Sequence, residues 1–214
     1  MDISIIIPYN INRGYLEEAI KSCEDQDFIG TYEIIVEKND YNVAINRNAA
    51  IKRAKGKYIK LLDEDDVLPP GSLRLLFDNK NDNDLTIGNF YIFNDGSFYQ
   101  EYECTIPEKI SKLAARNTIA YGSILYRKQS ILDVGGFNES LITGEDFELT
   151  LRLADYGCKF NLIPDIVFGH RKHIMQKSDA YYQVNPEWVK KRKVLIDNIR
   201  NQFINNHKII NIEY

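Results

Sequence analysis

The chain has few residues of the kinds that mark several classes of protein. Its 214 residues include only three cysteines, Cys23, Cys104 and Cys158, which are far apart and odd in number. Their spacing is not that of a metal site or a disulfide framework, and it fits a reducing compartment. Lys and Arg total 27 against 31 Asp and Glu, which gives a formal net charge of -4. This balance does not favour nucleic acid as a partner.

Long apolar runs, internal repeats and glycine-rich phosphate loops are also missing from the sequence. The apolar stretch at residues 5–7 ends at Pro8, so it is too short for a signal peptide or a membrane span. No P-loop or dinucleotide fingerprint follows it. We therefore expect a soluble, cytoplasmic chain, or the soluble domain of something larger, without a membrane span.

Apolar and amphipathic segments alternate through the first part of the chain. Residues 3–8 are a continuous apolar run, typical of a strand buried on both faces of a parallel sheet. Further segments indicate a helix at 16–23, a strand at 32–36, a helix that ends near Gly56 and a strand at 58–62. The alternation predicts an α/β fold with a mostly parallel, Rossmann-like sheet and helices on both faces. Ligands of such sheets bind at the carboxyl ends of the strands.

Four acidic residues follow the strand predicted at 58–62: Asp63, Glu64, Asp65 and Asp66. Adjacent carboxylates repel one another unless a hard cation neutralises them, so the cluster indicates a site for Mg²⁺ or Mn²⁺. Such ions commonly hold a diphosphate. A solvated acidic turn is the alternative interpretation of the same pattern.

The rest of the chain predicts a small, mixed second half of the sheet. Turn residues at 94–97 between two β-type segments indicate an antiparallel hairpin. Thr105 and Glu108 are typical of a capping box for a helix that reaches about residue 116. A strand at 120–126, a helix at about 145–156 and a final amphipathic helix from residue 185 follow.

A series of short segments then resembles, in order, the family 2 glycosyltransferases. They are residues 4–10, 15–20, 33–36, 46–48, 56–59, 62–66 and 144–148. The resemblance implies a GT-A fold and an inverting, metal-dependent enzyme that uses a nucleotide-sugar donor. It implies one domain over residues 1–214, with a nucleotide-sugar-binding half to about residue 100 and an acceptor-binding half from about 101. Since many relatives are longer, we also consider that the chain is a catalytic domain of a longer protein.

The resemblance assigns roles to the acidic residues. Asp63 and Asp65 match the outer carboxylates of the family's DxD motif. Asp65 is implied as a ligand of Mn²⁺ or Mg²⁺ and Asp63 as a metal or ribose contact, while Glu64 contacts the donor or points away. Asp146 matches the general base, and Glu145 holds the acceptor or orients that base. Without the resemblance, Glu145 and Asp146 also suit a helix amino terminus.

Nucleotide recognition is implied at the ends of the first strand and near the second helix. Pro8, Tyr9 and Asn10 match the segment that contacts uracil or a similar base. Arg47 matches an arginine that reaches the nucleotide, although a helical arginine is commonly a solvated partner of a nearby acid.

Two further segments match the family less closely. After Val36 the usual acidic pair is replaced, so Asn39, or Glu37 or Asp40 with a shifted loop, is expected to accept the hydrogen bond from the base. A late basic segment resembles the one that completes the metal site. There His173 is the expected ligand and His170 the alternative.

The expected function is transfer of a sugar from a UDP-hexose to a hydroxyl of a glycan or another acceptor. One alternative is a nucleotide-sugar or glycan-binding module that has lost activity. Another is a sugar-phosphate nucleotidyltransferase, but that class needs a glycine-rich loop where this chain has Pro8, Tyr9 and Asn10.

Overall fold

The computed structural model describes residues 1–11, 13–38, 42–96, 99–173, 186–206 and 211–212. In this part of the chain seven strands form one sheet, in the order β2-β1-β3-β6-β4-β5, with β7 also paired to β4. The strands are β1 (Ile3–Tyr9), β2 (Tyr32–Lys38), β3 (Tyr58–Leu61), β4 (Leu85–Phe93), β5 (Tyr99–Tyr102), β6 (Ile124–Arg127) and β7 (Phe160–Arg171).

The sheet is mixed, but most strands point the same way. β1 is parallel to both β2 and β3, and β4 is parallel to β7. β6 is antiparallel to both β3 and β4, and β5 is antiparallel to β4 in the expected hairpin. The predicted α/β class, with a mostly parallel sheet, is therefore confirmed.

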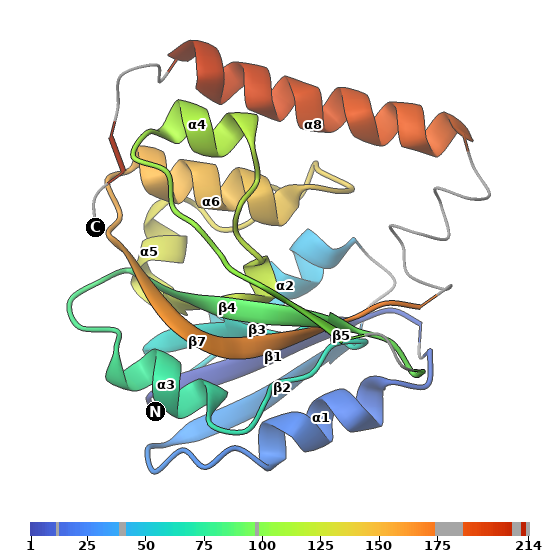
Figure 1. Cartoon of the computed structure of the whole chain (residues 1–214), viewed down its shortest axis with the longest axis vertical. Coiled ribbons are helices and arrows are strands. Elements are labelled where there is room, and N and C mark those ends of the chain that lie inside the picture. Colours follow the sequence, from blue (N-terminus) through green and yellow to red (C-terminus); the bar gives the residue numbers. More distant parts are fainter. Residues whose placement is uncertain (12, 39–41, 97–98, 174–185, 207–210, 213–214) are drawn as a thin grey trace.

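Helices cover both faces of the sheet (Figure 1). They are α1 (Leu16–Glu24), α2 (Val43–Arg53), α3 (Ser72–Asp78), α4 (Ile110–Ala115), α5 (Lys128–Asp133), α6 (Glu145–Asp155) and α8 (Pro186–Asn206), with a 3₁₀ helix, η1 (Tyr121–Ser123). α1 and α3 lie on one face, and α8 crosses above α4 and α6 on the other. None of the helices described combines the length and apolar character needed to cross a membrane.

The side chains of β1 point alternately to the two faces of the sheet, and the core has one part on each face. Ile3, Ile5 and Ile7 pack with the side chains of α1 and α3, whereas Ile6 packs on the opposite face with α2, α4 and α6. Successive strand residues point to opposite faces, and β1 lies between β2 and β3. All four isoleucines are therefore fully buried, which holds β1 firmly in the core.

Two sequence expectations need correction. The capping box was wrong: α4 begins later, with Lys109 as its N-cap and no side-chain cap. Thr105 is instead tied to Thr118, since its amide donates to the Thr118 carbonyl at 3.0 Å. The predicted strand at 120–126 starts as the 3₁₀ helix η1, and only its last residues join β6.

Strand β7 was not predicted, although it is twelve residues long. Pro164 interrupts its apolar pattern, and proline is usually absent from inner strands. β7 accommodates it with register shifts near Asn89 of β4. At its far end, Gly169 and Val67 exchange two backbone hydrogen bonds of 2.9 and 3.0 Å. β7 thereby holds the acidic loop (residues 63–66) that follows β3.

Asn48 of α2 fixes the turn that follows α5. Its side chain accepts from the amide of Phe137 at 2.8 Å and donates to the carbonyl of the same residue at 2.9 Å. The Asn48 amide is only 8% exposed, so water does not replace these bonds readily.

We expect Asn48→Ala to lower the free energy of unfolding by about 2 kcal/mol or more, because it leaves two buried backbone groups of Phe137 unpaired. Urea unfolding measures this change. Asn79→Ala is the matched control, since that exposed amide makes one bond to the Leu75 carbonyl; its effect should stay below about 0.5 kcal/mol. Equal losses in the two variants would contradict the role of Asn48.

Candidate functional site

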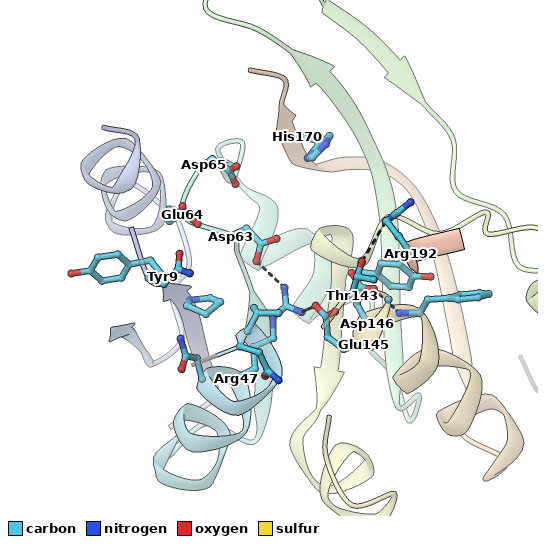
Figure 2. Close-up of a pocket in the computed structure, with 18 of the residues that line it drawn as sticks. Tyr9, Arg47, Asp63, Glu64, Asp65, Thr143, Glu145, Asp146, His170 and Arg192 are labelled. Atoms are coloured by element: carbon cyan, nitrogen blue, oxygen red, sulfur yellow. Dashed lines mark hydrogen bonds and ion pairs between the residues drawn. The ribbon is translucent and has the colours of Figure 1, made fainter. Parts of the chain in front are cut away.

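A cavity of about 640 Å³ opens where β1 and β3 end. Figure 2 shows the acidic loop on one side of it and the start of α6 on the other. The cavity brings together ten of the residues selected from the sequence: Pro8, Tyr9, Asn10, Arg47, Asp63, Glu64, Asp65, Glu145, Asp146 and His170. These residues are far apart in the chain, so only the fold makes them neighbours.

Arg47 joins the two sides of the cavity. One nitrogen of its guanidinium lies 2.8 Å from Asp63 Oδ1, and another lies 2.9 Å from Glu145 Oε1. Its guanidinium also lies 5.3 Å from the centre of the Phe137 ring. The Arg47 and Glu145 side chains are only 6% and 9% exposed, whereas that of Asp63 is 47% exposed. The Arg47–Glu145 pair is thus screened by protein, and the Asp63 pair faces the cavity.

Asp146 lies in the first turn of α6, at the amino terminus of that helix. The backbone amide of Phe147 donates to Asp146 Oδ1 at 2.7 Å. Burial raises the pKa of Asp146 to about 7, the charge of Glu145 adds to that rise, and Arg47 opposes it. A carboxylate with a pKa near neutrality is well matched to general base catalysis.

Glu64 points into the same cavity and does not turn away. It forms an ion pair with Arg13, a residue that the sequence patterns did not single out. Burial raises the pKa of Glu64 to about 7, and the charges of Asp65 and Asp63 add to it. No motif marks Arg13, because its partner lies 51 positions away in the chain.

Asp65 lies beside His173, with Oδ2 and Nε2 2.9 Å apart. Of the two histidines considered, His173 is therefore the one that contacts Asp65. Among the residues described, no group of three His, Cys, Asp or Glu side chains is arranged to hold a metal ion alone. Mg²⁺ is usually bound through one or two carboxylates together with substrate phosphates. The Asp65–His173 pair has the chemistry for such a shared site.

His170 instead contacts Asp66, with Nδ1 and Oδ1 3.1 Å apart. Asp66 also accepts the backbone amide of Arg171 at 2.8 Å. Burial lowers the pKa of His170, but the hydrogen bond and charge of Asp66 outweigh it and raise that pKa to about 9. The pair fastens the acidic loop to the end of β7, while His170 also borders the cavity.

Among the described residues, some predicted ones do not line the cavity: His173, and the segment after Val36, which begins at the end of β2. Glu37 forms an ion pair with Arg53 and does not line the cavity. Asn39 and Asp40 lie outside the described residues. Lys38 Nζ lies 5.8 Å from the centre of the Tyr9 ring, so the end of β2 does approach the first strand.

The cavity also has a wall that sequence patterns did not indicate. Arg192 and Arg200 of α8 line it, together with Asn117 and Tyr121. The four-residue spacing of helical side chains could have suggested a shared face of α8, but not which face meets the cavity.

The sequence is similar to a known protein family and to individual relatives. The family model described as Glycosyl transferase family 2 matches residues 34–134. An uncharacterized glycosyltransferase of Methanocaldococcus jannaschii is 28% identical over 208 residues, covering 88% of this chain and 69% of the relative. A GalNAc(5)-diNAcBac-PP-undecaprenol beta-1,3-glucosyltransferase of Campylobacter jejuni is 26% identical, covering 67% of this chain and 57% of the relative.

Solved structures are similar over more of the chain. S. aureus TarS 1-349 in complex with UDP-GlcNAc superposes with a TM-score of 0.70 at 18% identity, covering 95% of this chain and 70% of that one. Its complex with UDP has a TM-score of 0.64 at 17% identity, with coverage of 98% and 67%. These likenesses concern the fold.

We expect Arg47→Met to lower the free energy of unfolding by about 3 kcal/mol or more, because it leaves the buried Glu145 carboxylate without its partner. Adding Glu145→Gln should recover part of that loss by removing the unpaired charge. Asp63→Asn is the control: its side chain is 47% exposed, so its loss should stay near 1 kcal/mol or below. Chemical denaturation measures the free energy of unfolding of all variants. Equal losses for Asp63→Asn and Arg47→Met would contradict the importance of the buried Arg47–Glu145 pair.

Proposed function

Because the chain belongs to glycosyltransferase family 2 and has the GT-A fold, we propose that it is an inverting glycosyltransferase. It takes a sugar from a nucleotide-sugar donor, with a UDP-hexose favoured, and moves it to a hydroxyl of a glycan or another acceptor. One observation carries the proposal: a single cavity contains both the acidic loop after β3 and Asp146 at the start of α6. A glycosyltransferase needs a group that stabilises the departing diphosphate and a base that takes the hydroxyl proton, both within reach of the same sugar.

The donor lies on the side of the acidic loop. Pro8, Tyr9 and Asn10 line this end and offer stacking and backbone hydrogen bonds to the base. Asn39 remains the proposed partner of the base's N3 hydrogen; Glu37 could serve only by leaving Arg53. A UDP-sugar is supported by TarS, a protein of similar fold solved with UDP-GlcNAc and with UDP.

The metal-binding residues are proposed to be Asp65 and His173, with Asp63 as a further metal or ribose contact. Mn²⁺ or Mg²⁺ bound there would neutralise negative charge that develops on the departing nucleoside diphosphate. In the same proposal, the half up to about residue 100 binds the donor and the half from about residue 101 binds the acceptor, while His173 reaches from the second half to the metal.

Asp146 acts as the general base. It takes the proton of the acceptor hydroxyl as that oxygen bonds to the anomeric carbon. The bond from this carbon to the diphosphate oxygen breaks on the opposite face, so the configuration inverts. Arg47 holds Glu145 beside Asp146, and it links this base to the donor side through Asp63.

A binding module without activity remains the competing function, and one experiment separates the two. The protein is mixed with UDP-, GDP- and dTDP-sugars, with and without Mn²⁺, and both the melting temperature and release of the nucleoside diphosphate are measured. A ligand that binds the folded state raises its melting temperature. Binding with no release from any donor, either to water or to a panel of sugar acceptors, would favour the module.

Asp146→Asn should lower kcat by about 10²- to 10⁴-fold, because the amide cannot accept the hydroxyl proton. Its affinity for UDP should stay unchanged, since Asp146 does not contact the donor in this proposal. Asp133→Asn, the same change at an exposed position of α5, is the control and should retain full activity. Wild-type turnover in Asp146→Asn would disprove the base assignment.

The rate should depend on pH through the raised pKa of Asp146. Only the deprotonated carboxylate accepts a proton, so kcat/KM is expected to fall about tenfold per pH unit below about 7 and to level off above it. UDP binding measured across the same range separates this effect from donor affinity. A rate that is flat between pH 5.5 and 8.5, with unchanged UDP binding, contradicts the assignment.

A further inference from the structure

Helix α8 supplies a basic wall to the cavity. Arg192, Ile196 and Arg200 all line it, and their four-residue spacing places them on one face of the helix. Five basic residues and two acidic ones are present in α8: Lys190, Lys191, Arg192, Lys193 and Arg200, against Glu187 and Asp197. Of these charged residues only Arg192 and Arg200 line the cavity, so the part of α8 that faces it is basic.

Packing places this wall next to the base. Arg192 Nε lies 3.3 Å from the hydroxyl oxygen of Thr143, three residues before Asp146. Gly144 lies against Ile196 so closely that an added Cβ would be 2.5 Å from its Cδ1 atom. Gly144 also has a φ of +75°, which favours glycine. α8 is thus seated directly over the start of α6.

The other charged groups of the cavity already have partners. Arg13 pairs with Glu64, and Arg47 pairs with Asp63 and Glu145. Arg200 is less fully paired: its buried Nε, like that of Arg47, has no hydrogen-bond partner among the residues described. Its one ion pair, at 3.5 Å to Asp197, is partly exposed and therefore weak.

The position of this wall relative to Asp146 assigns it to the acceptor. Figure 2 shows Arg192 to the right of Asp146, with Asp63 and Asp65 to its left. An inverting displacement requires the attacking hydroxyl to approach from the face opposite the diphosphate. If the diphosphate lies at the acidic loop, the acceptor must lie toward α8.

We propose that the acceptor carries an anionic group, a phosphate or a carboxylate, which Arg192 and Arg200 bind while its hydroxyl faces Asp146. This inference rests on the proposed function. Guanidinium groups bind both kinds of anion through paired hydrogen bonds. Tyr121 lines the same wall, and its buried hydroxyl has no partner in the part of the chain described, so it is a further donor to the bound acceptor.

The test measures sugar binding with the donor site filled by UDP and Mn²⁺. Glucose, glucose 6-phosphate and glucuronic acid are compared by titration calorimetry, so that phosphate and carboxylate are separate arms. At least one anionic sugar should bind about tenfold or more tightly than glucose, and added salt should reduce the difference. Equal or undetectable binding of all three sugars overturns the inference.

The variant Arg192→Gln/Arg200→Gln should abolish this preference and leave the affinity for UDP unchanged. Lys190→Gln/Lys193→Gln is the control, because it removes the same charge from exposed positions of α8 that do not line the cavity. It should keep the preference, while circular dichroism and melting temperature check that both variants fold. A preference that survives in the arginine variant overturns the inference.

The same measurements separate this inference from the proposed function. A tenfold or greater loss of UDP affinity in Arg192→Gln/Arg200→Gln would assign the arginines to the donor diphosphate, which overturns the acceptor site but not the transferase. If wild-type protein neither binds nor hydrolyses any nucleotide sugar with Mn²⁺, the proposed function itself fails.

Discussion

The site depends on one buried guanidinium. Arg47 connects Asp63, on the loop after β3, with Glu145, the first residue of α6, at 2.8 and 2.9 Å. Two segments that are more than 80 residues apart in the chain are thereby held on opposite sides of one cavity. Two carboxylates this close would repel each other without the cation between them, and a buried charge without a partner is costly. Arg47 thus ties the acidic loop to the start of α6.

Burial, together with nearby negative charges, raises the pKa values of two carboxylates in the cavity. The pKa values of Glu64 and Asp146 are both raised to about 7, chiefly by burial, so each is poised to change its protonation near neutral pH. Such shifts are common at functional sites because catalysis needs groups tuned away from their ordinary values. The acidic loop that carries Glu64 is anchored to β7 by the hydrogen bonds of Asp66 and of the adjacent Val67.

Most of the first half of the fold was predictable, because β1, α1, β2, α2 and β3 follow clear apolar periodicities. β7 was missed since Pro164 breaks its pattern, and α4 was misplaced since Thr105 bonds to Thr118. The acidic loop and Asp146 were identified by motif. Arg13 was not, because its partner Glu64 lies 51 positions away in the chain. The arginines of α8 were not either, because helical spacing does not tell which face of α8 meets the cavity.

Local pattern and composition thus specify the elements of this protein and the chemical types of its central residues. Apolar periodicity indicates which side chains of a helix or strand can be buried. A run of carboxylates indicates a local concentration of negative charge. Both can be read from neighbouring positions in the sequence. Which groups meet is decided by packing across the sheet: His173 beside Asp65, His170 beside Asp66, Glu37 beside Arg53, and α8 over α6. Those distances depend on how strands and helices stack in three dimensions, and no short stretch of sequence contains that information.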